Sequence, residues 1–234
     1  MDPRLEEVMG KIEDEALRRR VSALLENPTI EIEGKVYSGL SLDEAPGGLS
    51  RHHSYPSGLI EHMLSSSEIA LTLCNVVEKI YHGRVDKDLV LSGVLLHDIF
   101  KPLIYSVKKD GTYGVTPLAD CLDHLSLIVA ELIRRGFPLN LIHVVCAHHG
   151  WEAGSIAPRT VEALICHLAD VTDSQLNGEV LRAARYLVRD ATGEDLRLLA
   201  SKEAFEIVHS KAAEGWDGVK ETIEKIGIVL IQMI

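Results

Sequence analysis

The sequence lacks the features that mark several large protein classes. Its four cysteines, Cys74, Cys121, Cys146 and Cys166, stand far apart and form no C-x-x-C pair. This spacing argues against a zinc knuckle and against a dense disulfide framework. A basic stripe is also missing, because 24 Lys and Arg residues face 35 Asp and Glu residues and leave a net charge of −11. We therefore expect no tight binding of duplex nucleic acid.

Long apolar runs are absent as well. The longest nearly apolar segment spans residues 226–234, far short of the ~20 residues that a bilayer span requires. The first residues show no positive region followed by an apolar one, so no signal peptide is expected. These absences favour a protein of the reducing cytoplasm with no membrane partner. The segment 226–234 is nevertheless too apolar for water. It packs either on its own bundle or on a second copy, so a homodimer is one expectation.

What is present indicates a folded globular chain. Apolar residues make up 46% and charged residues 25% of the 234 residues, which is close to the average for globular proteins. The length suits a single domain. We divide it into an N-terminal helix and hairpin (1–50), a core (51–177) and C-terminal helices that complete the bundle (178–234).

The spacing of apolar residues predicts mostly helix. Two short alternating stretches instead predict β-hairpins, one over 29–37 around Gly34 and one over 103–115 around Asp110-Gly111. Pro102 is expected to close the helix before the second hairpin. The predicted helices span 4–26, 57–82, 86–100, 121–135, 138–149, 160–176 and 179–190, with one or two more from Ser201. The fold class is therefore all-α, a helical bundle with one or two small β-hairpins.

Histidine is the unusual component, with 11 residues. His62 shares a helical face with leucines and isoleucines, so it points where apolar side chains point. The pair His97-Asp98 follows an apolar helix, and Asp170 lies inside another apolar pattern. The remaining imidazoles in such surroundings are His124, His148 and His149.

Any one of these residues, taken alone, reads as a hydrogen-bonded core side chain. Together they are poorly explained in that way, because each ionisable group in a core costs several kcal/mol unless it is paired or bound to metal. Five imidazoles and two carboxylates suit Mn²⁺, Fe²⁺, Co²⁺, Ni²⁺ or Zn²⁺ better than Mg²⁺ or Ca²⁺. A carboxylate also has two oxygens and can bridge two cations, which an imidazole cannot. The sequence predicts a transition-metal site.

The order H…HD…H…HH…D from about Arg51 to Asn177 resembles the HD superfamily of metal-dependent phosphohydrolases. The resemblance implies that one metal is held by His62, His97, Asp98 and Asp170, and a second by Asp98, His124 and His148. It makes His149 either a further ligand or a phosphate contact. Family members that bind a third metal carry a glutamate where this chain has Gly58, so two metal ions are expected. Phe100 replaces the glycine of the usual HD-I-G-K motif.

A finer resemblance is to the HD domain of bacterial 3′-to-5′ exoribonucleases. Two stretches carry it, residues 52–62 and the run from His148 to Asn177. Those nucleases have an OB-fold domain ahead of the HD domain, and the ~50 residues here cannot hold one. The expectation is therefore a small phosphorylated substrate or a short oligonucleotide rather than processive RNA degradation.

The chemistry follows from the ligands. A water bridging two cations would be deprotonated and would attack phosphorus, while Lys101, one turn after Asp98, would neutralise charge on the phosphoryl oxygens. Lys101 also reads as a solvated lysine at a helix end. Three residues, Arg51, His52 and His53, are candidates to line the substrate entrance or belong to a surface loop. Trp151 would stack on a base or be an ordinary half-buried tryptophan. His167 is expected to hydrogen-bond Asp170.

The function expected is a metal-dependent phosphohydrolase, either a phosphomonoesterase or a phosphodiesterase, acting on a nucleotide or short oligonucleotide. One alternative is a di-iron HD-fold oxygenase, which uses a similar ligand set on carbon substrates. Another is an HD module that binds a nucleotide without turning it over. Neither the substrate nor the native metal follows from the sequence.

Overall fold

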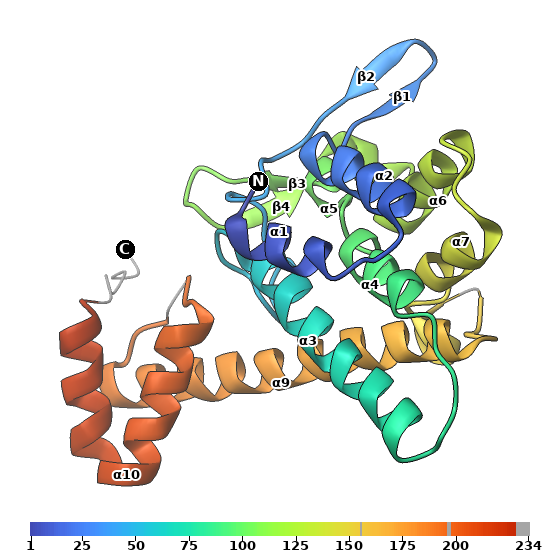
Figure 1. The fold of residues 1–234 in the computed structure, drawn as a ribbon. Helices are drawn as coiled ribbons and strands as arrows, with labels where there is room; N and C mark the ends of the chain where they lie inside the picture. Colours follow the sequence, from blue (N-terminus) through green and yellow to red (C-terminus); the bar gives the residue numbers. More distant parts are fainter. Residues whose placement is uncertain (155, 196–197, 228–234) are drawn as a thin grey trace.

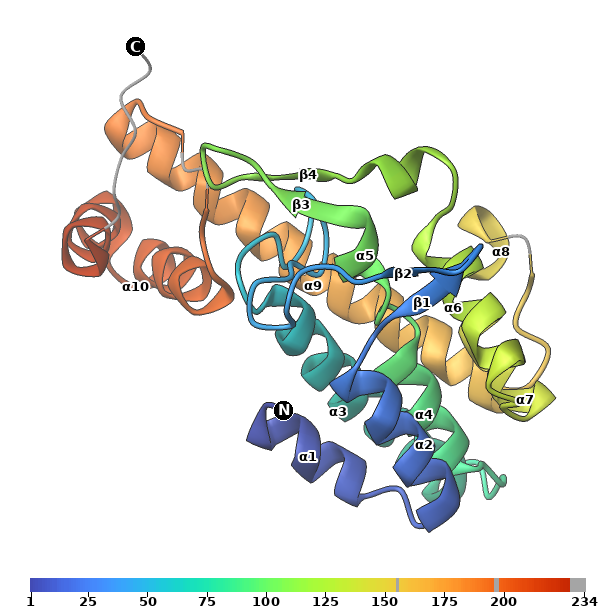
Figure 2. The same ribbon diagram turned by 90° about the horizontal axis from the view of Figure 1, so that it is seen from above.

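A computed structural model describes residues 1–154, 156–195 and 198–227. The central elements are three helices, α3 (Gly58–Lys79), α4 (Lys87–Leu96) and α9 (Val161–Thr192). Helix α9 crosses the whole molecule, and α3 and α4 lie side by side on it (Figures 1 and 2). The apolar segment 226–234 lies, from residue 228 on, outside the described residues, so the homodimer stays a prediction.

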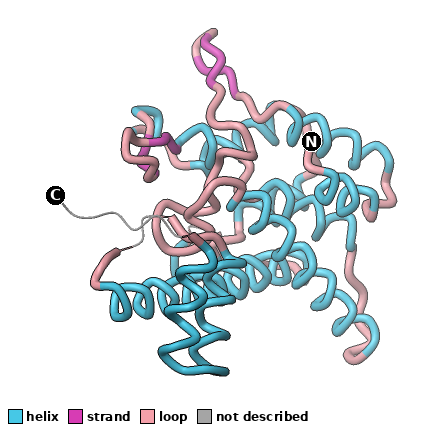
Figure 3. The backbone as a smooth tube through the Cα atoms, turned by 90° about the vertical axis from the view of Figure 1, so that its left-hand side faces the viewer, coloured by secondary structure: helices cyan, strands magenta, loops and turns pink. Residues whose placement is uncertain are grey.

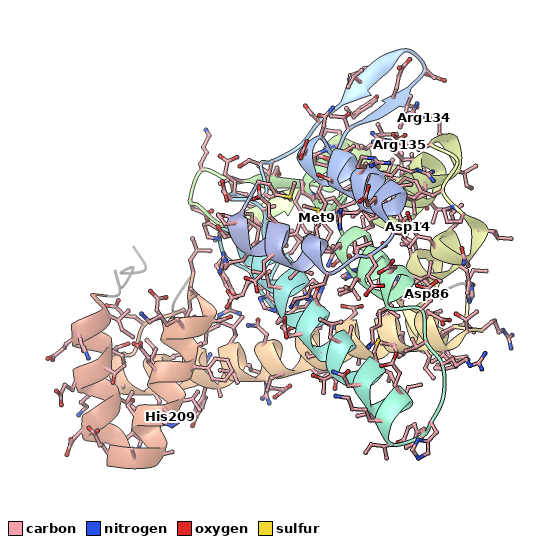
Figure 4. The ribbon with its side chains drawn as sticks, viewed as in Figure 1. Met9, Asp14, Asp86, Arg134, Arg135 and His209 are labelled. Carbon is pink, nitrogen blue, oxygen red and sulfur yellow. The ribbon has the colours of Figure 1, made fainter. Side chains whose placement is uncertain are left out.

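The N-terminal segment forms two helices, where a single helix was predicted over 4–26. The first is α1 (Pro3–Gly10) and the second is α2 (Glu15–Glu26). Asp14 separates them, because its carboxylate accepts hydrogen bonds from the backbone of the first turn of α2. Asp88 at the start of α4 accepts from the backbone N–H of residues 13 and 14 at 2.8 and 2.7 Å. These carboxylates place the break between α1 and α2 beside the start of α4, where Figure 4 labels Asp14 and Asp86.

Pro102 does not close a helix, contrary to the prediction. Helix α4 ends at Leu96, and Pro102 lies in the first turn of a separate short helix, α5 (Lys101–Ile104). Proline is tolerated there because first-turn N–H groups have no partner within the helix. His97 and Asp98 therefore lie in the connection between α4 and α5.

Both predicted hairpins are present. Strands β1 (Ile30–Ile32) and β2 (Lys35–Tyr37) pair antiparallel, as do β3 (Tyr105–Val107) and β4 (Tyr113–Val115). Figure 3 shows strands only in these two places, with helix and loop elsewhere in the described chain. The predicted all-α fold with two small β-hairpins is confirmed.

The helices predicted over 121–135 and 138–149 have different first and last residues in the structure. The single-turn 3₁₀ helix η1 (Pro117–Asp120) precedes α6 (His124–Arg134), whose N-cap is Asp123. Helix α7 (Leu139–Cys146) ends before His148, and the short α8 (Gly150–Ala153) follows. His124 is thus the first residue of α6, and His148 and His149 lie in the turn between α7 and α8.

The C-terminal half of α9 carries a second hydrophobic cluster. Two helices were predicted over 160–176 and 179–190, but α9 continues through Gly178 as one helix of 32 residues. Helix α10 (Ser201–Ile226), kinked at Gly215, packs against this half of α9 (Figure 1). The cluster contains Leu181 and Ile207, and the loop before α3 contributes Tyr55 to it. No described helix is long and apolar enough to cross a membrane.

Candidate metal centre

The predicted ligands come from five parts of the chain and meet inside the bundle. Helix α3 supplies His62, the end of α4 supplies the His-Asp pair, and α9 supplies Asp170. The start of α6 and the α7–α8 turn supply the other imidazoles. His62 is fully buried, and His97, Asp98 and His148 are each 1% exposed.

One group of donors gathers around one oxygen of Asp98. Asp98 Oδ2 lies 3.4 Å from both His62 Nε2 and His97 Nε2. The two imidazole nitrogens are 3.1 Å apart. Asp170 Oδ1 lies 3.3 Å from His62 Nε2 and 3.8 Å from His97 Nε2. These are the four residues that the sequence assigned to one metal.

A second group gathers around the other oxygen. Asp98 Oδ1 lies 3.2 Å from His124 Nε2 and 3.9 Å from His148 Nε2. The ring of His149 lies 3.9 Å from that of His148 and is tilted by 53° to it, and nitrogens of His124, His148 and His149 all lie within 4.8 Å of one another. The carboxylate of Asp98 therefore lies between two separate sets of donors.

The donor set fits divalent metal ions. Asp98 Oδ1, His124 Nε2 and His148 Nε2 are buried without a hydrogen-bond partner among the described residues. Orphaned buried polar atoms are costly, and a cation would satisfy all three. His97 Nδ1 and His148 Nδ1 donate to backbone carbonyls, each at 2.7 Å. Each ring thus keeps an Nε2 lone pair for a ligand bond.

For Asp98 and His148, the electrostatics favour the protonation states that metal ligands need. Burial alone would raise the pKa of Asp98, but the charge of Lys101 and the neighbouring His97 ring hold it well below its usual range. Burial, with His97 nearby, holds the pKa of His148 well below its usual value. Near neutral pH the carboxylate is therefore an anion and the imidazole is neutral, as metal binding requires.

Asp173 orients His62 and was assigned no role from the sequence. Its Oδ2 accepts from His62 Nδ1 at 2.6 Å and from His53 Nε2 at 2.8 Å. Ser65 Oγ donates to its other oxygen at 2.5 Å. Asp173 lies one turn after Asp170 on α9, and this spacing was the one available signal.

His53 is part of this buried network, although the sequence made it a candidate either for the substrate entrance or for a surface loop. It is 2% exposed, and its Nδ1 lies 2.8 Å from the hydroxyl of Tyr55. That hydroxyl donates to Glu61 at 2.7 Å and contacts Ser201 at the start of α10. Both ring nitrogens of His53 are therefore used internally, and none is left for a substrate.

Comparison with known proteins agrees with this geometry. The HD domain family matches residues 59–175, half of the chain. The chain belongs to the HD domain family. A curated relative, the dihydroneopterin 2′,3′-cyclic phosphate phosphodiesterase of Methanocaldococcus jannaschii, is 36% identical over 230 residues, which cover 97% of this chain and 92% of the relative. No solved structure matches.

Family membership makes this chain a metal-dependent phosphohydrolase of the HD superfamily, as the sequence predicted. HD domains bind divalent metals, and the described residues include three groups of His and Asp side chains able to hold one. The finer comparison with the exoribonucleases stays a prediction.

The cluster formed by His62, His97, Asp98, His124, His148, His149 and Asp170 is called the HD centre below. Lys101 lies at its edge. Its ammonium forms an ion pair with Asp98 Oδ2 and donates to the carbonyl of Gly47 at 2.6 Å. It is 8% exposed, so the solvated lysine considered from the sequence is not what the structure shows. Phe100 is fully buried in the hydrophobic core.

The other candidates lie around the HD centre. The ring of His52 lies 5.3 Å from that of His62, and its Nδ1 is buried without a partner among the described residues. Burial, with Lys101 nearby, lowers the pKa of His52 to about 3. Arg51 is exposed, and Trp151 is 62% exposed, with its ring 5.8 Å from that of His167 and nearly perpendicular to it. His167 Nδ1 donates to the carbonyl of His148 at 2.7 Å instead of to Asp170.

Two glycines allow the ligand-bearing loops to close on the helices. A Cβ at Gly58 would lie 2.1 Å from the carbonyl oxygen of His53. Gly150 has a φ of +69°, and a Cβ there would lie 2.2 Å from the ring of His167. A larger residue at Gly58 would displace the backbone of His53, and one at Gly150 would displace the ring of His167 and strain the backbone.

Proposed function

We propose that this chain is a dinuclear phosphodiesterase that opens a cyclic phosphate ester on a small nucleotide-like molecule. The observation that carries the proposal is Asp98, whose two oxygens face two separate sets of imidazoles. The relative of known activity supports the reaction type, since it acts on a 2′,3′-cyclic phosphate.

The proposed ligands are those of the sequence prediction. His62, His97, Asp98 and Asp170 would hold one divalent ion of the group Mn, Fe, Co, Ni or Zn. Asp98, His124 and His148 would hold a second, and His149 lies near enough to join them. Two such ions would lower the pKa of a water molecule and neutralise phosphate charge.

The chain's own residues would supply the rest of the chemistry. Opening a cyclic diester consumes one water and converts a singly charged phosphate into a monoester with a further ionisable oxygen. Positive charge near the phosphoryl group is therefore worth more late in the reaction. Lys101 is the buried cation next to Asp98. His52, with its free Nδ1, would accept or donate a hydrogen bond at the substrate.

The test is a substrate panel with reconstituted protein. It contains dihydroneopterin 2′,3′-cyclic phosphate, the four nucleoside 2′,3′-cyclic phosphates, linear dinucleotides and p-nitrophenyl phosphate, each with Mn²⁺ or with Fe²⁺ under nitrogen. The proposal expects ring opening to one phosphate monoester without oxygen. Activity on monoesters alone would overturn the diesterase assignment. Turnover that consumes oxygen would favour the oxygenase alternative instead.

A further inference from the structure

A cavity on α9 has no role in the proposed reaction. Its volume is about 1040 Å³, which is the size range of small-molecule sites. It lies between the outer half of α9 and the loop before α3. Its walls include Ser50, Arg51, Ser174, Gly178, Arg182 and Arg185.

The cavity begins beside a proposed metal ligand. Asp170, Ser174, Gly178 and Arg182 are successive members of an i, i+4 row on α9, so they follow one another along one side of the helix. Ser174 Oγ donates to Asp170 Oδ1 at 3.2 Å. From Asp170 the row extends about 6 Å to Ser174 and about 18 Å to Arg182.

The loop wall also connects the cavity with the HD centre. A Cβ at Gly178 would lie 3.4 Å from the backbone oxygen of Arg51 and 3.8 Å from Cβ of His52. The ring of His52 in turn lies 5.3 Å from that of His62. The cavity and the HD centre thus share a wall made of one loop and one helix.

The cavity is positive on an acidic protein. Four arginines line it against Glu179 and Asp195, a balance of +2 on a chain whose net charge is −11. Arg182 pairs with Glu179, and Arg189 lies 3.9 Å from Asp195. Arg51 is exposed and makes no ion pair with any residue that the structure describes.

Arg185 is the most enclosed of the four. Its guanidinium donates to Ser50 O at 2.9 Å and to Ser54 Oγ at 2.8 Å, while its Nε is buried without a partner among the described residues. Burial lowers the pKa of this guanidinium, although an arginine stays charged at any physiological pH. A bound anion would offset the cost of that burial.

We infer that this arginine pocket, made by Arg51, Arg182, Arg185 and Arg189, binds a second phosphate group of the substrate, remote from the ester that is cleaved. The inference rests on the proposed function and narrows its substrate class. It selects a nucleoside or short oligonucleotide 2′,3′-cyclic phosphate that carries a further phosphate. Guanidinium groups suit this role because their planar donors match phosphate oxygens.

Binding of two product-like ligands tests the inference without requiring turnover. Adenosine 3′-phosphate and adenosine 3′,5′-bisphosphate differ only in the second phosphate, and calorimetry on metal-loaded protein gives both affinities. We expect the bisphosphate to bind at least about tenfold more tightly, the value of one charge-assisted hydrogen bond. Equal affinities in the wild type would overturn the inference.

Variants that remove positive or negative charge from the pocket should change the affinity ratio in opposite directions. Arg51→Ala and Arg182→Ala should each weaken bisphosphate binding about tenfold and shrink the ratio of the two affinities. Glu179→Gln releases Arg182 from its pair and should raise that ratio. Arg84→Ala removes an exposed positive charge from the α3–α4 loop and controls for the loss of net charge.

The outcomes distinguish a failure of the inference about the pocket from a failure of the proposed function. If the ratio of the two affinities falls equally in Arg84→Ala and in the pocket variants, the net charge of the protein explains the effect, and the inference is overturned. Failure to hydrolyse any cyclic phosphate would overturn the proposed function, while the affinity ratio would still report on the pocket.

Discussion

Asp98 links the two halves of the centre through one side chain. Its oxygens lie 3.4 Å from His62 Nε2 on one side and 3.2 Å from His124 Nε2 on the other. It is the one described carboxylate that faces both sets of imidazoles. Removing it should therefore affect both of the proposed metal ions, whereas removing Lys101 should affect neither.

We expect Asp98→Ala to lose metal and hydrolysis together, because two cations would then face each other without a shared anion. Lys101→Ala should keep close to two metal ions per chain and lose about 10²- to 10³-fold in kcat, the usual effect of losing one charge-stabilising group. Lys101→Met fills the same buried space and controls for packing. Elemental analysis and rates on the same preparations decide this. An active, metal-replete Asp98→Ala protein would refute the dinuclear assignment.

Asp173→Asn should lower metal affinity by about ten- to one-hundredfold, the typical effect of losing a partner that orients a ligand. The amide keeps one oxygen for the N–H groups of His62 and His53 but loses the negative charge that strengthens both bonds, and its NH2 group would face the hydroxyl of Ser65. Asp173→Glu keeps the carboxylate and should restore part of the affinity. Ser65→Ala removes the hydroxyl that donates to Asp173 and to the backbone carbonyls of Glu61 and His62, leaves the carboxylate in place and serves as the matched control. Competition with a chromogenic chelator measures all four proteins.

At the scale of elements, a buried carboxylate accepts several hydrogen bonds at the C-terminal end of α6. Glu131 is fully buried and accepts from Arg134 at 2.7 Å and from Arg135 at 2.6 Å. Arg20 of α2 donates to the backbone carbonyl of Arg135 at 3.0 Å, and Figure 4 labels Arg134 and Arg135 at this end of α6. This cluster joins α6 to the N-terminal helices.

Stability should depend on the ionisation of Glu131. Burial alone would raise its pKa, but the hydrogen bonds of Arg134 and Arg135 hold it below the usual value of 4.5. Because the folded pKa lies below the unfolded one, the contribution is complete above the unfolded pKa and is lost as pH falls through the folded pKa.

Glu131→Gln should therefore cost about 2 kcal/mol of unfolding free energy at pH 7, and this difference should shrink below pH ~4.5 as the wild-type carboxylate becomes protonated. Urea unfolding at several pH values measures it. Glu15→Gln changes the same residue type at an exposed position of α2 and is the control. A difference that is constant with pH would show that the charge of Glu131 is not what matters.

At the scale of the whole molecule, the HD centre joins elements that are distant in the chain. Its donors come from α3, the α4–α5 connection, α6, the α7–α8 turn and α9. The network from Asp173 through Tyr55 extends it to α10. Metal binding should therefore stabilise the entire fold.

A chelator should lower the melting temperature by about 5–10 °C, because a ligand at 100 times its Kd contributes about 2.7 kcal/mol, and 1 kcal/mol shifts a protein of this size by about 2–4 °C. Adding Mn²⁺ after the chelator is removed should restore the original value. Calorimetry is the measurement. An unchanged melting temperature would mean that the imidazoles and carboxylates satisfy one another without metal.

Local patterns in the sequence determined the fold class, both hairpins and the set of candidate ligands. Hairpins follow from turn residues between alternating segments, and His62 stands out because it occupies an apolar helical face; both signals lie within a few neighbouring residues. The order of the histidines and aspartates along the chain, through its resemblance to the HD superfamily, predicted which ligands share a metal ion. The boundaries were less well determined, since the break before Asp14 depends on Asp88, a residue far along the chain.

Only the tertiary structure decided which residues support the ligands and where charge gathers. Asp173 meets His62 across 111 residues and His53 across 120, so no local pattern could pair them. The continuity of α9 through Gly178 and the arginine pocket along it likewise depend on the loop of residues 50–54 lying against that helix. Periodicity records which face of a helix is buried, whereas the partner of that face is fixed only when the whole chain packs.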